Sequence, residues 1–262
     1  MSPRPSDAPH TPRASATIAP HTPLHQYYGD DANRESYVQG LFDETAPDYD
    51  RIERVLALGS GPWYRRQALL RAGLKAGDHV LDVGIGTGLV AREACAIIGS
   101  GGKLVGVDPS PGMMHQVKVP GVELVQGYAE RLPRPQASAD FLSMGYALRH
   151  ISDVAAAFSE FERVLKPGAR LCILEITRPQ TAWGTKLLRG YMRAAVPMIA
   201  RVVGKQGHTS ELWRYYWDTI EACMAPPQVL AALEAAGFTQ VQRHVELGIF
   251  SEFTAVKAGS PS

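Results

Sequence analysis

Three glycines at alternate positions follow a short apolar run that contains an aspartate. Residues 81–88 read LDVGIGTG, so Gly84, Gly86 and Gly88 come directly after a run typical of a buried strand. Glycine has no β-carbon, so a ligand can approach the backbone of such a turn closely. Glycine-rich turns that follow a strand commonly bind nucleotides. The sequence therefore predicts a site for a nucleotide-like cofactor.

The spacing of the glycines argues against a dinucleotide such as NAD. A dinucleotide turn has the pattern G-x-G-x-x-G, in which the third glycine lets the following helix approach the strand and face a pyrophosphate. Here the pattern is G-x-G-x-G, and Leu89 occupies the position where the dinucleotide pattern needs its last glycine. A cofactor without a pyrophosphate fits the sequence better.

Two aspartates near the glycines favour S-adenosylmethionine, which has no phosphate but carries a sulfonium, a cationic amino-acid end and two free ribose hydroxyls. Asp108 ends the apolar run VGVD, and its carboxylate can accept hydrogen bonds from both ribose hydroxyls. Asp82 ends the preceding run, where it would hold the turn and face the amino-acid end of the ligand. Either aspartate alone could be a helix cap or a turn residue. As a pair that brackets a glycine turn, they favour S-adenosylmethionine.

The elements that must position these residues alternate between short β-rich runs and helical runs. The β-rich runs are 79–84, 103–108, 122–127, 140–148, 170–176, 239–247 and 249–258, and helical runs at 89–98, 111–118, 154–165 and 226–238 lie between them. Alternation of this kind predicts an α/β, Rossmann-like fold with a mostly parallel seven-stranded sheet. Ligands of such sheets bind at the carboxyl ends of the strands, where the glycines lie.

The chain is expected to form a tail and one domain. Residues 1–25 are rich in Pro, Ser, Thr and Ala without an apolar period, which predicts a disordered tail. Residues 26–262 are expected to form a single domain, with N-terminal helices over 35–75 and a helical insertion over 178–224. We interpret the insertion as a lid or a wall of the acceptor pocket.

The insertion is rich in aromatic residues, which can either pack it onto the sheet or line a pocket. Trp183, Trp213 and Trp217 all lie within it. Pro197 near its centre is expected to break the helix, so that two halves fold over the carboxyl end of the sheet. A pocket lined in this way would favour an aromatic or prenylated lipophilic acceptor over a charged one.

Composition excludes several classes of protein. Twenty-seven Lys and Arg against 26 Asp and Glu give a net charge of +1, which argues against nucleic acid as a partner. Three cysteines lie far apart and outside any C-x-x-C pattern, which predicts a reduced, cytoplasmic protein without a bound metal: Cys95, Cys172 and Cys223. Pro197 and Arg201 interrupt the most apolar helical stretch, so no membrane-spanning helix is expected. A homodimer and weak association with a membrane surface remain open.

From about Val38 to the C-terminus, the sequence resembles the UbiE-type quinone-biosynthesis C-methyltransferases, a family of class I S-adenosylmethionine-dependent enzymes. LFDETAPDYD resembles an N-terminal signature of that family, carried here by Phe42, Asp43, Ala46, Tyr49 and Asp50. MGYALRHISD resembles its segment after the fourth strand, carried by Tyr146, Ala147, Leu148, Arg149 and His150. VLKPGARLCILEITRP matches its fifth-strand block, and the 26-residue spacing from Asp82 to Asp108 matches its first crossover.

The resemblance implies a set of cofactor contacts in addition to Asp82 and the three glycines. It implies contacts with the cofactor from Thr87, Asp108, Met113, Tyr128, Ala129 and Gly145. The chain departs from the family pattern at Tyr128, Ala147, His150 and Glu53, where the family has Asp or Asn, Gly, Asn and Asn. These departures surround the expected methyl-transfer pocket, so they concern the choice of acceptor more than methyl transfer itself.

Methyl transfer needs an electron-rich atom in line with the sulfonium methyl group. If that atom is a ring carbon ortho to a phenol, a base or a cation that stabilises the phenolate accelerates the reaction. His150 is a candidate base, although it could simply be a surface histidine before a helix, and Arg149 is a candidate cation. By resemblance, Tyr49 closes over the cofactor.

The sequence thus predicts a methyltransferase that acts on a ring carbon of a lipophilic quinol or phenol. One alternative is an O- or N-methyltransferase of a hydrophobic secondary metabolite or a phospholipid head group. The other is a cofactor-binding protein without catalytic activity, which the complete set of acidic and glycine residues disfavours.

Overall fold

A computed structural model describes residues 17–56, 59–179, 181–203 and 209–259, and it contains one seven-stranded sheet. The strand order is β3-β2-β1-β4-β5-β7-β6. Neighbours among β1 to β5 are parallel, and β7 runs antiparallel to both β5 and β6. The strands are β1 (His79–Val83), β2 (Lys103–Asp108), β3 (Glu123–Gln126), β4 (Ala139–Gly145), β5 (Leu165–Ile176), β6 (Phe238–Glu246) and β7 (Phe250–Lys257). The predicted mostly parallel sheet is confirmed.

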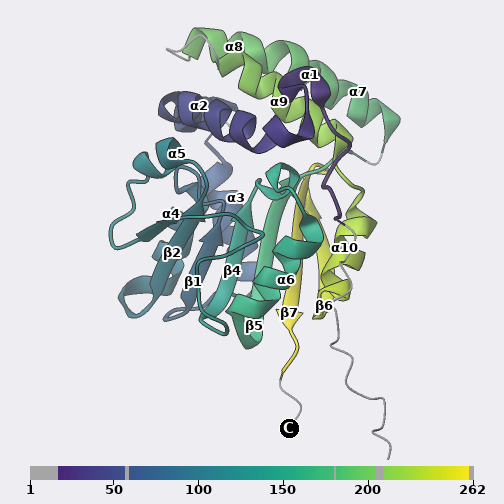
Figure 1. Ribbon diagram of the computed structural model, residues 1–262. Helices are drawn as coiled ribbons and strands as arrows, with labels where there is room; N and C mark the ends of the chain where they lie inside the picture. The colour runs from purple at the N-terminus through teal and green to yellow at the C-terminus, as the bar shows by residue number, and fades with distance from the viewer. Residues whose placement is uncertain (1–16, 57–58, 180, 204–208, 260–262) are drawn as a thin grey trace, which may run out of the picture.

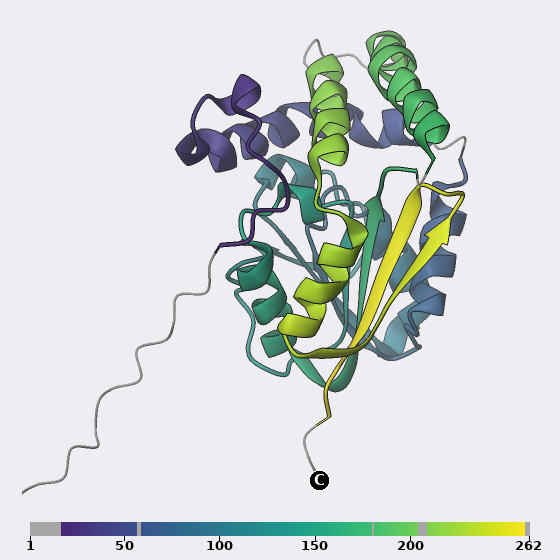
Figure 2. The ribbon, with the colours of Figure 1, turned by 90° about the vertical axis from the view of Figure 1, so that its right-hand side faces the viewer.

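Helices cover both faces of this sheet (Figures 1 and 2). One face carries α3 (Gly61–Arg71) and α4 (Leu89–Ile98), and the other carries α6 (Val154–Val164) and α10 (Pro226–Ala235). Successive strand residues serve the two faces in turn, because side chains alternate across a strand. In β4, Phe141 packs with α3 and α4, whereas the next residue, Leu142, packs with α6 and α10.

A third layer of helices lies over the carboxyl ends of the parallel strands and forms the helical cover (Figure 1). It consists of α2 (Arg34–Leu56), α7 (Ala182–Gly190), the π-helical turn η4 (Tyr191–Ala195), α8 (Val196–Val203) and α9 (Thr209–Ala222). Its buried residues form a separate apolar cluster around Trp213 and Trp217. Shorter elements complete the fold: α1 (His25–Tyr28), η1 (Asp31–Asn33), η2 (Gly99–Gly101), α5 (Pro111–His115) and η3 (Leu148–His150).

The prediction that Pro197 divides the insertion into two halves is wrong. Pro197 is the second residue of α8, and α7, η4 and α8 follow one another without a gap. Proline disrupts a helix by removing a backbone donor and crowding the preceding turn, and here the preceding turn is the π-helical η4. Residues 182–203 therefore form one continuous helical run, which Pro197 does not divide.

A disordered tail was expected over residues 1–25, and residues 1–16 of that range lie outside the described residues. The part that is described, however, is bonded to the domain. The backbone carbonyl of Ile18 accepts a hydrogen bond from the Val154 amide, and that of Pro20 accepts one from the Met224 amide. His21 and Leu24 are buried. Through these hydrogen bonds the N-terminal segment contacts both the start of α6 and the residues that follow α9. No local pattern in the sequence predicts these contacts.

Candidate active site

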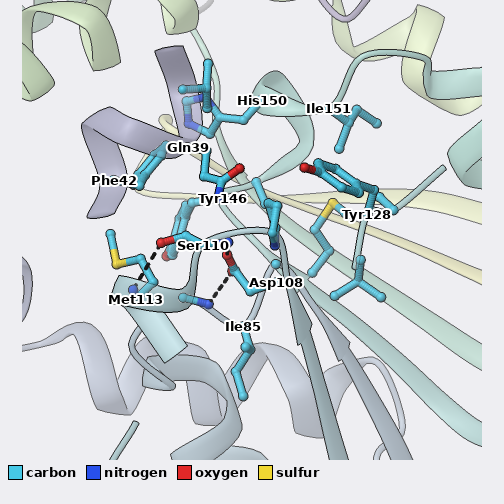
Figure 3. Close-up of a pocket in the computed structure, with 18 of the residues that line it drawn as sticks. Gln39, Phe42, Ile85, Asp108, Ser110, Met113, Tyr128, Tyr146, His150 and Ile151 are labelled. Carbon is cyan, nitrogen blue, oxygen red and sulfur yellow. Dashed lines mark hydrogen bonds between the residues drawn. The ribbon is translucent and has the colours of Figure 1, made fainter. Parts of the chain in front are cut away.

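A cavity lies between the carboxyl ends of β1, β2 and β4 and the helical cover (Figure 3). Eight of the ten residues predicted to contact the cofactor line it: Gly84, Gly86, Thr87, Asp108, Met113, Tyr128, Ala129 and Gly145. These residues come from five separate segments, and the parallel sheet brings them together because its strands end at one edge.

The glycine turn leaves space that side chains would fill. Gly84 and Gly86 have positive φ angles of 68° and 56°, a region that glycine adopts without strain. A β-carbon at Gly84 would lie 2.6 Å from the β-carbon of Ala147. Gly88 also has a positive φ, but it does not line the cavity and instead caps the start of α4. The turn therefore fits a ligand held close against the backbone.

The carboxylate of Asp108 faces the cavity and is fixed by two backbone amides. Its Oδ2 accepts a hydrogen bond from the Gly86 amide and its Oδ1 from the Ser110 amide, each at 2.8 Å (Figure 3). Burial raises the pKa of Asp108 to about 6, although these two hydrogen bonds act in the opposite direction. Because each carboxylate oxygen accepts more than one hydrogen bond, both can still accept the hydroxyls of a ribose.

Asp82 lies elsewhere than expected. It was predicted to face the amino-acid end of the ligand, but it does not line the cavity. Its Oδ1 accepts a 2.7 Å hydrogen bond from Ser143, its partner on the neighbouring strand β4. Burial raises the pKa of Asp82 to about 7, the Ser143 hydrogen bond opposes this, and the nearby Asp108 adds to it. The structure thus places Asp82 beneath the turn, between two strands.

Two aspartates of α2 connect the helical cover to the cofactor loops. Asp50 accepts a 2.5 Å hydrogen bond from the Thr87 hydroxyl in the glycine turn. Asp43 accepts hydrogen bonds from the Ser110 hydroxyl at 2.6 Å and the Gly112 amide at 2.7 Å. Both acids belong to the LFDETAPDYD segment, whose resemblance to a family signature gave no indication of these partners.

His150 is the most unusual polar residue of the cavity. Its ring lies 5.1 Å from that of Phe42, edge to face, and is stacked on Tyr215 at 5.6 Å. Within the described part of the chain, neither ring nitrogen has a hydrogen-bond partner. Burial holds the pKa of His150 well below its usual value, and the cation of Arg149 lowers it further. The imidazole is therefore neutral at physiological pH, with one nitrogen to donate and one to accept.

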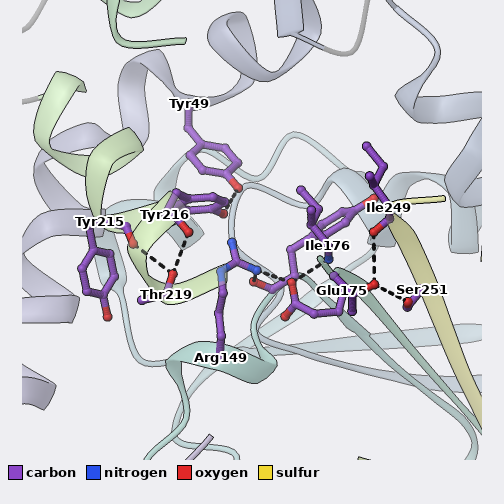
Figure 4. Close-up of polar contacts among 11 residues, drawn as sticks. Tyr49, Arg149, Glu175, Ile176, Tyr215, Tyr216, Thr219, Ile249 and Ser251 are labelled. Atoms are coloured by element: carbon purple, nitrogen blue, oxygen red, sulfur yellow. Dashed lines mark hydrogen bonds and ion pairs between the residues drawn. The ribbon is translucent and has the colours of Figure 1, made fainter. Parts of the chain in front are cut away.

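Arg149, predicted as a cation near the methyl group, does not line the cavity. Its guanidinium forms a fully buried ion pair with Glu175 at the end of β5 (Figure 4). It also lies 4.1 Å from the centre of the Tyr216 ring, which does line the cavity. A buried arginine needs an anionic partner, and Glu175 supplies it. Arg149 therefore contacts the cavity through two of its lining residues, since its Nη1 also donates a 3.0 Å hydrogen bond to the carbonyl oxygen of Tyr146.

Tyr49 lines the cavity, as predicted for a residue that closes over the cofactor. Its hydroxyl lies 2.5 Å from the Tyr216 hydroxyl, and its ring is stacked on Trp213 at 6.1 Å. Burial raises the pKa of Tyr49 well above its usual value, and Tyr216 adds to the effect, so the phenol stays protonated. Its part in catalysis stays a prediction.

Several lining residues were not singled out from the sequence. Arg34, Glu35 and Gln39 reach the cavity from the first turns of α2. A hydrogen bond to Glu35 is the main cause of the raised pKa of Tyr128, which also lines the cavity. Tyr146, which the MGYALRHISD segment had already singled out, also lines the cavity, and its positive φ of 60° is rare for a residue with a side chain and occurs at functional sites. Nothing in the local sequence signals these roles.

The sheet order, the glycine turn and the carboxylate at the end of β2 together define the class I S-adenosylmethionine-dependent methyltransferases. A solved S-adenosylmethionine-dependent methyltransferase from Aquifex aeolicus has a similar fold, with a TM-score of 0.57 and 22% identity over 79% of this chain and 97% of that one. Residues 30–257 match the model of the ubiE/COQ5 methyltransferase family, and the chain belongs to that family.

Two curated relatives are similar over most of their length. The ubiquinone/menaquinone biosynthesis C-methyltransferase UbiE of Hahella chejuensis (strain KCTC 2396) is 30% identical over 86% of this chain and 93% of the relative. The demethylmenaquinone methyltransferase of Mycobacterium sp. (strain KMS) is 33% identical over 84% of this chain and 94% of the relative. The protein is a methyltransferase whose methyl donor is S-adenosylmethionine.

Proposed function

We propose that the protein methylates a ring carbon of a lipophilic quinol-type acceptor, ortho to a phenolic hydroxyl. The observation that carries this proposal is His150, a neutral imidazole with two unpartnered ring nitrogens among the aromatic residues of the cavity. An unpartnered polar group in an apolar site costs free energy unless a ligand satisfies it. A phenol supplies both an apolar ring and a hydroxyl for that group. The names of the two relatives support an acceptor of the quinone type.

Bound S-adenosylmethionine supplies an electrophilic methyl group, whose bond to sulfur breaks as the new bond forms. The residues of this chain position the acceptor and move its protons. His150 accepts the hydroxyl proton of the phenol as the ring carbon attacks, which raises the electron density on that carbon. The protonated His150 then returns its proton to the oxygen, and the ring proton leaves the methylated carbon for solvent, which restores the aromatic ring and releases one proton overall. Tyr49 and Tyr216 form the cavity wall that keeps water from the reacting atoms.

The test is turnover with methyl-labelled donor and a short-chain quinol, with mass spectrometry to locate the label. Labelled product should carry the methyl group on a ring carbon. His150→Ala should lower kcat by about a hundredfold, the usual contribution of a general base, and leave the affinity for the donor unchanged. His150→Asn should retain more activity, because its amide still accepts a hydrogen bond.

His115→Asn is the matched control, since His115 is exposed on α5 outside the cavity lining, and it should behave like the wild type. Label on oxygen or nitrogen would overturn the proposal in favour of an O- or N-methyltransferase. Full activity of His150→Ala would remove His150 from the mechanism. We also propose that the protein is cytoplasmic. We further propose that it consists of an N-terminal tail and a single domain.

A further inference from the structure

The outermost helical run of the cover presents large apolar side chains to solvent. Trp183, Leu187, Tyr191 and Met198 are 74%, 59%, 40% and 64% exposed, and we call them the outer stripe. The first three are spaced by four residues, which places them on one face of α7 and η4. Contiguous exposed apolar side chains of this size usually mark an interaction surface.

Packing within the domain does not require the outer stripe. The opposite side of the same helical run is already apolar, since Met192 and Val196 are buried against α9 in the cluster with Trp213. An ordinary surface helix has one apolar face and one polar face. This run has a second apolar face, which needs a partner outside the domain.

The charged residues of the helical run that carries the outer stripe are basic. No Asp or Glu occurs between Thr181 and Val203, and Lys186 is exposed next to the stripe. Arg189 and Arg193 come two residues after Leu187 and Tyr191, so they lie on the side of the helical run that faces α9. Arg189 and Arg193 form ion pairs with Glu221 and Asp218, but both arginine side chains remain about half exposed. Residues 181–222 contain six Lys and Arg against three Asp and Glu, whereas the rest of the chain contains 21 against 23. Residues 181–222 are thus net positive in a nearly neutral protein, which complements an anionic partner, whereas α2, the other helix of the cover, contains three Arg against six Asp and Glu.

We propose that the outer stripe docks onto an anionic lipid bilayer, with α7, η4 and α8 lying in the plane of the membrane surface. Helices that lie at such a surface combine Trp, Leu and similar side chains with flanking Lys and Arg. Trp and Tyr favour the boundary between lipid and water, and each basic residue near an anionic leaflet contributes about 1 kcal/mol. A second copy of this chain is a poorer partner, because a two-fold contact would bring the same basic residues together. Among the described helices, none is both long and apolar enough to cross a bilayer, so the contact is peripheral.

The proposed function gives this docking its biological role, and that role rests on the acceptor being lipophilic. A prenylated acceptor resides in the bilayer, and residues of α2 and α9 line the cavity between the sheet and the cover (Figure 3). Binding of the cover to the membrane would bring the cavity close to that acceptor. The outer stripe is exposed whatever acceptor the cavity binds.

The test is flotation of the full chain with vesicles of phosphatidylcholine, alone or mixed with phosphatidylglycerol. The wild type should float with the anionic vesicles, and high salt should weaken the binding. Trp183→Ser combined with Leu187→Ser should lower the affinity by about tenfold or more, since each side chain loses its burial in lipid. Trp63→Ser is the matched control, because Trp63 is 62% exposed on α3, on a different part of the surface. It should float like the wild type.

Absence of flotation, or equal loss in the Trp63 and stripe variants, would overturn the docking proposal. A stripe variant that turns a dimer into a monomer would show that the surface binds a second copy instead. Turnover with a water-soluble, short-chain quinol separates this proposal from the proposed function. The stripe variant should keep that turnover, so loss of flotation leaves the methyl transfer intact, whereas inactivity of the wild type would count against the proposed function alone.

Discussion

The hydroxyl oxygens of Tyr49 and Tyr216 lie 2.5 Å apart, although 167 residues separate the two positions in the chain. The contact joins α2 to α9 at the wall of the cavity. The guanidinium of Arg149 lies over the face of the Tyr216 ring in a cation–π contact, and it forms an ion pair with Glu175. A series of buried polar contacts, which begins with Glu175 at the end of β5, therefore supports the wall of the cavity (Figure 4).

The first prediction concerns this pair of tyrosines. Tyr49→Phe and Tyr216→Phe should each lower kcat, and the double variant should lose less than the sum of the two losses, because either change removes the same hydrogen bond. A coupling free energy of about 0.5 to 3 kcal/mol is typical of residues in direct contact. A double-mutant cycle on kcat and on urea unfolding measures it. Strict additivity would show that the two hydroxyls act independently.

The second prediction concerns the buried ion pair. Arg149→Met leaves the Glu175 carboxylate buried without a counter-ion, so the free energy of unfolding should fall by about 3 to 5 kcal/mol. Arg149→Met combined with Glu175→Leu should recover most of that loss, because no charge remains. Lys166→Met, which breaks a partly exposed pair with Asp140, should cost about 1 kcal/mol or less. Urea titrations followed by circular dichroism decide the matter, and a double variant as unstable as Arg149→Met would contradict the assignment.

The third prediction tests Asp108 as the acceptor of the ribose hydroxyls. Asp108→Asn removes the charge and replaces one acceptor oxygen with an NH2 group, which also loses the hydrogen bond from the Gly86 or the Ser110 amide. Hydrogen bonds to a charged group contribute about 1.5 to 3 kcal/mol, so the Kd for S-adenosylmethionine and for S-adenosylhomocysteine should rise by about ten- to a hundredfold. Isothermal titration calorimetry measures both ligands. Asp140→Asn, on β4 away from the cavity, should bind like the wild type. Unchanged affinity in Asp108→Asn would reduce Asp108 to a residue that shapes the loop.

The fourth prediction follows from the burial of Asp82, whose pKa rises from 3.8 to about 7 in the folded protein. Between these values the native state keeps a proton that the unfolded chain has lost, so the Asp82 contribution to the free energy of unfolding declines as the pH rises. Asp82→Asn cannot ionise and lacks this decline. Its stability relative to the wild type should therefore increase from pH 5 to pH 8 by about 3 kcal/mol, because about two pH units lie between pH 5 and the folded-state pKa and each contributes about 1.4 kcal/mol. Thermal and urea unfolding at both pH values measure the change.

Asp140→Asn serves as the control for this pH dependence. Partial burial raises the pKa of Asp140, but the hydrogen bonds from Lys166 and the His79 amide lower it by more, so the net shift is downward. Asp140 is therefore already ionised at pH 5 in both states, and its variant should differ from the wild type by the same amount at pH 5 and pH 8. A flat difference for Asp82→Asn as well would show that the buried carboxyl is ionised throughout.

Local features of the sequence were sufficient to predict the fold and the cofactor edge of the cavity. The alternation of β-rich and helical runs predicts a parallel sheet, and a parallel sheet gathers its carboxyl ends at one edge. The residues at those ends or directly after them, Asp108, Gly145, Gly84 and Gly86 among them, therefore meet in space as expected. Their position along the chain determines their position in the fold.

The direction of individual side chains and the contacts between distant segments depended on the tertiary structure. Asp82 follows the same strand-end rule as Asp108, but its side chain lies against Ser143 of β4 instead of the cavity. Arg149 and His150 are neighbours in the sequence, yet one is paired with Glu175 behind Tyr216 and the other faces the cavity without a partner. Successive side chains point in different directions, and what each one meets is decided by the elements packed against it. Those elements are α2, β5 and α9, which lie far apart in the sequence and meet only in the folded chain.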